Sequence, residues 1–182
     1  EPIPVGKYTL ESLTTGMYSD PKIVYREYIQ NSVDSLENAV SLGLLEPQSM
    51  RIDIIVNAEE SYISIKDNGT GIPADAASKT LMNVGSSKKR NSNNRGFRGI
   101  GRLGGMSYCD TLVFTTSAEN EPVKTIVSFD CKKLRRLLVP GEFEDMSLSS
   151  VLEEITTIDT LPERPEKHYL CVEMKEVNGF SD

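Results

Sequence analysis

The chain has 182 residues, enough for one domain with a substantial core, and its 38% hydrophobic and 26% charged residues are ordinary for a soluble globular protein. A net charge of −7 disfavours a general nucleic-acid-binding surface. No apolar run approaches the ~18 residues of a membrane span, and residues 1–15 lack the apolar core of a signal peptide.

Three cysteines, Cys109, Cys131 and Cys171, are widely spaced along the chain. They match neither a zinc pattern nor a disulfide framework, which predicts reduced thiols in a cytoplasmic protein. His168 is the one histidine, and we expect it at a surface or a strand start rather than as a ligand. The length suits a single domain over residues 1–182, and because the chain starts at Glu1 rather than Met, we expect it to be a fragment of a longer protein.

The first clear element is a helix over about residues 20–42. An aspartate and a proline suit its first turn, and Gly43 suits the position just after its end. At about 100° per residue, Glu27, Asn31 and Asp34 share one face of this helix. We expect the helix to pack through nearly the opposite face, which carries Ile29, Val33, Leu36 and Val40.

Alternating apolar residues predict two strands at 51–56 and 61–66, joined as a hairpin. The second strand runs directly into Asp67-Asn68-Gly69-Thr70-Gly71-Ile72-Pro73, which is a strong turn signal. An aspartate at the end of a buried strand faces the interior, where an unpaired carboxylate is costly. We therefore expect a donor group that satisfies Asp67.

The remaining elements give the fold class. We expect a short helix at 74–83, a polar loop at 84–94, a glycine segment at 96–105 that opens another helix, strands at 111–117, 123–129 and 168–175, and helices at 132–138 and 147–156. This order of helix, hairpin, helix, glycine segment and antiparallel strands predicts an α+β fold rather than a parallel βαβ fold.

The glycine segment contains Gly96-x-x-Gly99-x-Gly101, which matches neither a Rossmann fingerprint nor a P-loop. Glycines before a helix start leave backbone N–H groups free to bind an anion. Residues 88–102 also hold basic residues and no acidic one, and a local cationic loop in an acidic protein fits a small anionic ligand. The segment is therefore predicted to be a phosphate-binding lid.

Three motifs in order, Glu27-x-x-x-Asn31-x-x-Asp34, Asp67-x-Gly69-x-Gly71 and the glycine segment, resemble those of the GHKL ATPases. These include gyrase B, the ninety-kilodalton heat-shock chaperone, MutL and histidine kinases. The resemblance covers most of the chain, about residues 20–117 and more loosely to residue 176. It implies the Bergerat fold, a two-layer α/β sandwich with a mixed, mostly antiparallel sheet, helices on one face, and ATP bound between the two layers.

The resemblance also implies roles for single residues. Asp67 would accept a hydrogen bond from the adenine amino group, Asn31 would offer its side-chain oxygen to Mg²⁺, and Glu27 would orient or deprotonate the attacking water. Asp34 would lie near the adenine or ribose, or help order the helix. The other expected nucleotide contacts are Gly69, Gly71, Ile72, Asn83, Gly85, Lys88, Gly96, Arg98, Gly99, Ile100 and Gly101.

Glu27 separates branches of this superfamily, because histidine kinases usually have Asn there. Glu27 favours hydrolysis, or phosphotransfer to serine as in anti-sigma-factor kinases. The segment from Gly96 to Asp110 is similar to that of the chaperone, so we expect a chaperone-like ATPase that is slow without a lysine from a neighbouring domain. The alternatives are a DNA-processing ATPase akin to gyrase B or MutL, a nucleotide-gated switch, and a serine kinase of the anti-sigma type.

The expected partners are ATP or ADP and an unidentified client or downstream domain, without a membrane and without nucleic acid for this fragment; the resemblance allows an ATP-dependent dimer.

One departure from the family pattern concerns the last strand. The family usually places Gly-Thr before it, and that Thr supports the adenine-binding Asp through a water. Lys167-His168 takes this place here, so either another hydroxyl such as Thr115 substitutes, or the base is held differently.

Overall fold

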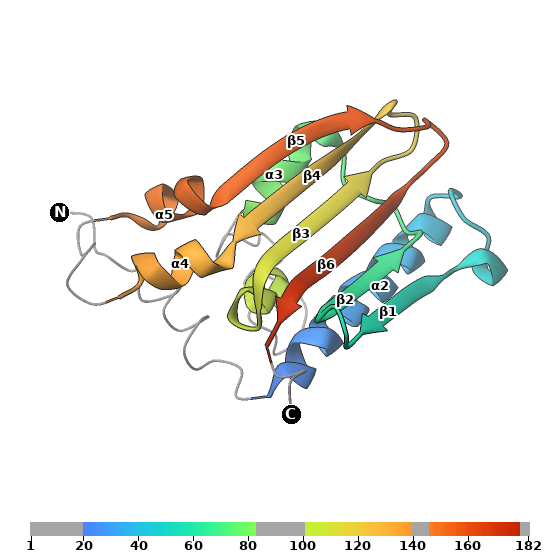
Figure 1. Ribbon diagram of the computed structural model, residues 1–182. Coiled ribbons are helices and arrows are strands. Elements are labelled where there is room, and N and C mark those ends of the chain that lie inside the picture. Colours follow the sequence, from blue (N-terminus) through green and yellow to red (C-terminus); the bar gives the residue numbers. More distant parts are fainter. Residues whose placement is uncertain (1–19, 83–100, 140–145, 179–182) are drawn as a thin grey trace, which may run out of the picture.

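A six-stranded sheet organises the residues that the computed structural model describes, which are 20–82, 101–139 and 146–178 (Figure 1). The strands follow the order β1-β2-β6-β3-β4-β5, and each neighbouring pair is antiparallel. Their bounds are β1 Ile52–Asn57, β2 Tyr62–Asp67, β3 Cys109–Ser117, β4 Val123–Asp130, β5 Thr156–Pro162 and β6 Tyr169–Val177.

The helices lie mainly on one side of this sheet. They are α2 Pro21–Ser41, α3 Ala74–Met82, α4 Cys131–Leu137 and α5 Leu148–Ile155, with 3₁₀ turns η1 Pro47–Ser49 and η2 Gly101–Ser107. Figure 1 shows α2 and α3 behind the sheet, while its near face carries no helix of the described chain. The expected α+β sandwich with helices on one face is confirmed; within the described residues the sheet is antiparallel throughout rather than mixed.

Both ends of α2 form as the sequence predicts. The Asp20 side chain accepts a hydrogen bond from the backbone N–H of Lys22, and a proline occupies the first turn. At the other end Gly43 has a φ of +72°, and the N–H groups of Gly43 and Leu44 donate to the carbonyls of Val40 and Ala39. This is a Schellman motif, for which glycine is the favoured residue.

The prediction of which face α2 buries is wrong in part. The buried residues are Val24, Tyr28, Ser32, Leu36 and Ala39, whereas three of the four predicted apolar residues are only half-buried. Apolar periodicity misplaced this face because Tyr28 and Ser32 find polar partners in the interior. The row containing Glu27 and Asn31 therefore borders the buried stripe instead of lying opposite to it.

The core fills the space between the sheet and the helices. Phe114 of β3 packs edge-on against Tyr28 and Phe129, with ring centroids 6.3 and 6.1 Å apart. Cys109 and Cys131 are fully buried in this layer, and Cys171 is partly buried on the other face of the sheet. All three cysteines are free thiols, in agreement with the absence of a disulfide pattern in the sequence.

Strand β5 was not predicted. The sequence predicts a helix to residue 156, whereas α5 ends at Ile155 and Thr156 already pairs with Phe129 of β4. β5 is an edge strand that is exposed along nearly its whole length, so it lacks the alternation of buried and exposed residues that marks a strand. The available signal was that four of its seven residues, Thr156, Thr157, Ile158 and Thr160, are β-branched.

No helix in the described part of the chain is both long and apolar enough to cross a membrane.

Candidate functional site

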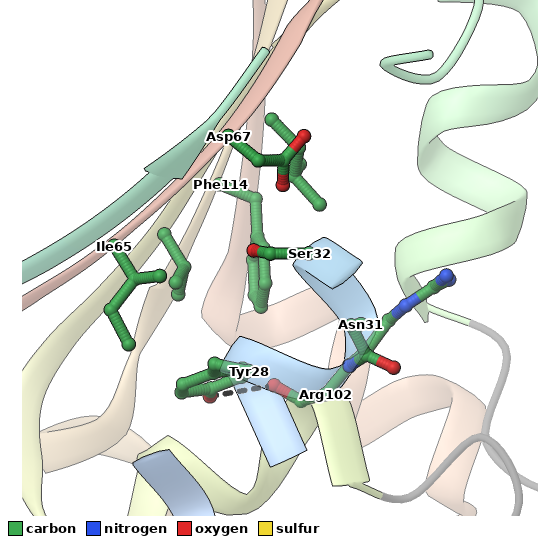
Figure 2. Close-up of a pocket in the computed structure, with 9 residues that line it drawn as sticks. Tyr28, Asn31, Ser32, Ile65, Asp67, Arg102 and Phe114 are labelled. Carbon is green, nitrogen blue, oxygen red and sulfur yellow. Dashed lines mark hydrogen bonds between the residues drawn. The ribbon is translucent and has the colours of Figure 1, made fainter. Parts of the chain in front are cut away.

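A pocket opens between α2 and the sheet (Figure 2). Figure 2 shows Asp67 at the sheet end of the pocket and Tyr28 with Arg102 at the far end, where the Arg102 side chain runs beside Asn31. The lining residues come from α2, three strands and η2, and they are Tyr28, Asn31, Ser32, Ile65, Asp67, Arg102, Phe114, Leu170 and Val172.

Asp67 ends β2 with its side chain directed into the interior, where it is 2% exposed. Its Oδ1 accepts the backbone N–H of Gly69 at 2.9 Å. Burial raises the pKa of the Asp67 carboxyl above its ordinary value, and the Gly69 N–H, the Ser32 and Ser35 hydroxyls and the Leu170 N–H oppose this rise in part. The prediction of a strand-end carboxylate that faces inward and finds a donor is confirmed.

The turn after Asp67 requires its glycines. Gly71 has a φ of +63°, and a Cβ added there would lie 1.9 Å from the carbonyl oxygen of Ser117. A Cβ on Gly69 would lie 2.2 Å from the Ser35 hydroxyl oxygen. The turn is thus held between α2 on one side and the end of β3 on the other, with no room for a side chain at either position.

A hydroxyl does support this turn, but it belongs to Thr116. Its Oγ1 accepts the N–H of Ile72 at 2.8 Å and donates to the carbonyl of Tyr169 at 2.9 Å. Thr116 pairs with Leu170, which pairs with Asp67, so the three side chains share one face of the sheet. Thr115, the hydroxyl suggested from the sequence, alternates to the other face.

The residue directly across the sheet from Asp67 is therefore Leu170, not Lys167 or His168. His168 lies just before β6, as expected for a strand start, yet its side chain is only 12% exposed. Its Nδ1 lies 2.5 Å from the carbonyl oxygen of Gly69, and its Nε2 lies 3.7 Å from a carboxylate oxygen of Glu119. The Lys167-His168 position thus contacts the turn through an imidazole rather than a hydroxyl.

The three polar residues of α2 separate in the structure. Asn31 lines the pocket, and Glu27 is half-buried one turn earlier on the same side of the helix. Asp34 is exposed and accepts a hydrogen bond from Gln30 at 2.9 Å, so it helps order the helix and does not line the pocket.

Most of the residues that line the pocket were not assigned from the sequence, and two of them, Tyr28 and Arg102, connect neighbouring elements. The Tyr28 hydroxyl donates to the Arg102 carbonyl at 2.8 Å and accepts the Gly105 N–H at 3.0 Å, which attaches η2 to α2. The Arg102 guanidinium donates to the carbonyl of Thr80 at 3.4 Å, and burial lowers its pKa. Arg102 was noted only as one of several basic residues, because a charge pattern does not tell which cation faces a pocket.

Part of the predicted site lies outside the described residues. This applies to the contacts expected from Asn83, Gly85, Lys88, Gly96, Arg98, Gly99 and Ile100. Gly101 is the first residue of η2, which occupies the place of the helix predicted after the glycine segment. Ile72 is partly buried and packs against the core.

A family profile of histidine kinase-, DNA gyrase B-, and HSP90-like ATPases matches residues 18–152, which is well over half of the chain. The chain belongs to this family. The match spans α2, β2, η2 and β3, which together with β6 form the pocket. A search of curated proteins finds no match. Membership assigns a nucleotide-binding domain of the GHKL ATPase type.

Proposed function

We propose that this GHKL domain binds Mg·ATP in the pocket and hydrolyses it slowly, as the N-terminal nucleotide-binding part of a chaperone-like ATPase. The buried Asp67 carboxylate carries the proposal, because it offers an acceptor inside a mostly apolar pocket. One of its oxygens accepts the Gly69 N–H, which leaves acceptor capacity for the amino group of adenine. Ile65, Phe114 and Val172 supply apolar surface for the purine.

The other end of the pocket suits the triphosphate. In the described part of the chain no other residue bonds the side-chain amide of Asn31, so its oxygen is available to a hard cation such as Mg²⁺. Mg²⁺ would neutralise phosphate charge when bound. The Arg102 guanidinium beside Asn31 adds positive charge at this end.

Glu27 is the proposed general base, since it lies one turn before Asn31 and a carboxylate can take a proton from water. The water oxygen then forms a bond to the γ-phosphorus, the bond from that phosphorus to the bridging oxygen breaks, and ADP leaves. Glu27 also supports the second candidate, phosphotransfer to a serine hydroxyl, in which the hydroxyl replaces water. The products separate the two activities, because only hydrolysis releases free phosphate.

Asp67→Asn tests binding. The amide loses the negative charge and turns a donor toward the adenine amino group, so we expect ATP to bind at least about 100-fold more weakly by calorimetric titration. The wild-type protein is the reference, and Asp34→Asn, outside the pocket, is the matched control. Equal ATP affinity of wild type and Asp67→Asn would overturn the proposal.

Glu27→Ala tests the chemistry. We expect the full-length variant to bind ATP with the wild-type affinity and to lose phosphate release, because only the proton acceptor is removed. Phosphate release is measured in single turnovers of the full-length protein. Hydrolysis that survives in Glu27→Ala would show that another group is the base.

A further inference from the structure

We propose that His168 is a positioning residue for nucleotide recognition: its bond to the Gly69 carbonyl fixes the turn that aims the Asp67 carboxylate at the base. This inference rests on the proposed function. It concerns the base end of the pocket, where the imidazole supports the turn in addition to the Thr116 hydroxyl.

Gly69 is bonded on both of its backbone groups. Its N–H donates to Asp67 Oδ1 at 2.9 Å, and its carbonyl oxygen lies 2.5 Å from His168 Nδ1. The chain Asp67–Gly69–His168 therefore links the buried carboxylate to the start of β6. Rotation of either peptide plane at Gly69 would break one of the two bonds.

The direction of the His168 bond follows from chemistry. A carbonyl oxygen can only accept, so Nδ1 must carry the hydrogen and donate it to Gly69. Nε2 then faces Glu119, whose carboxylate oxygen is 3.7 Å away. With its side chain only 12% exposed, the imidazole has little freedom to leave this position.

His168 differs from the other groups that hold the turn. Ser35 of α2 accepts the N–H of Thr70, and Thr116 of β3 accepts the N–H of Ile72. Both act on the residues that follow Gly69. His168 acts on Gly69 itself, the residue that bonds Asp67, so its loss should alter the orientation of the carboxylate more than the existence of the turn.

A matched pair of variants separates the two ring nitrogens. The side-chain amide nitrogen of Asn lies about where Nδ1 lies, and that of Gln about where Nε2 lies. His168→Asn can still donate to Gly69, whereas His168→Gln places its donor one methylene further away. Lys167→Ala, which removes the neighbouring side chain and its 3.8 Å ion pair with Glu163, is the control.

The measurement is the calorimetric affinity of the full-length protein and its variants for ATP, ADP and adenosine. We expect His168→Gln to weaken all three by the same factor, about tenfold, since the base is common to them. His168→Asn and Lys167→Ala should bind as the wild type does. Thermal unfolding of each variant verifies that it is folded.

Two results would overturn the inference: equal affinities of the Asn and Gln variants, or a loss confined to ATP, which would place the effect at the phosphates. A wild-type protein that binds none of the three ligands would instead reject the proposed function. Because His168→Asn preserves the donor and much of the side-chain volume, a failure of the Gln variant alone to fold would also count against the positioning role and indicate a structural one.

Discussion

The Asp67 carboxylate lies 2% exposed in a pocket with mostly apolar walls, and its burial raises the pKa. A buried charge of this kind costs folding free energy, and carboxyls with a pKa shifted by burial cluster at functional sites. The sequence predicted the buried position of Asp67 well, because a strand and a turn signal meet at it. The sequence did not predict the groups around it, since Ser32, Leu170 and Thr116 come close only through tertiary packing.

Asp67→Asn should change how stability depends on pH. Because the folded-state pKa is raised, the carboxyl contributes most to stability below its unfolded pKa of about 3.9, and this contribution is lost as pH rises through the folded pKa. The free energy of unfolding of the wild type minus that of Asp67→Asn should therefore fall as pH rises from the unfolded pKa to the folded pKa of Asp67. At higher pH the difference should stay level. Urea unfolding in the absence of nucleotide measures the free energy of unfolding of the wild type and of the variant at each pH. A difference that rises with pH would contradict the raised pKa.

Gly71→Ala and Gly43→Ala form a matched pair, because both glycines have positive φ, +63° and +72°. A Cβ at Gly43 meets nothing within 4 Å, so Gly43→Ala should cost only about 1–2 kcal/mol of backbone strain. Gly71→Ala should cost more and weaken ATP binding, since the methyl group meets the Ser117 carbonyl. Urea unfolding and titration with ATP test this, and equal costs for the two variants would contradict it.

At the scale of elements, α2 shows what a helix pattern can and cannot predict. Its ends are local chemistry, and the sequence placed them within two residues. Its buried face depends on what the helix packs against, and two polar side chains, Tyr28 and Ser32, displaced the apolar stripe. Both side chains line the pocket. The helix therefore breaks its apolar pattern at the residues that face the pocket.

Tyr28→Phe should loosen the attachment of η2 to α2. The ring would keep its packing against Phe114, but the buried N–H of Gly105 would lose its acceptor, at a cost of about 1–3 kcal/mol in unfolding free energy. Tyr62→Phe is the control, since it removes a hydroxyl bonded to Glu173 on the open face of the sheet, and it should cost less. Urea unfolding compares the two variants. If Tyr28→Phe loses no more unfolding free energy than Tyr62→Phe, the Tyr28 hydroxyl does not attach η2 to α2.

For the whole molecule, the order of elements was enough to predict an α+β fold and the resemblance implied a two-layer sandwich, but neither predicted the strand order. The sheet pairs β2 with β6, which brings Asp67 opposite Leu170, more than a hundred positions later in the sequence. No local pattern contains such a pairing, and β5 was missed for the related reason that an exposed edge strand has no buried face. The site is correspondingly non-local, because α2, β2, η2, β3 and β6 all contribute to it.

The burial of the cysteines means that their chemical modification can report on transient unfolding of the chain. Cys109 and Cys131 have no exposed surface, and burial raises the pKa of Cys171 to about 11, so little reactive thiolate is present at neutral pH. Alkylating reagents should therefore modify these thiols chiefly in molecules that have transiently unfolded. The rate of modification then measures the free energy of opening, and a nucleotide that stabilises the native state should slow it.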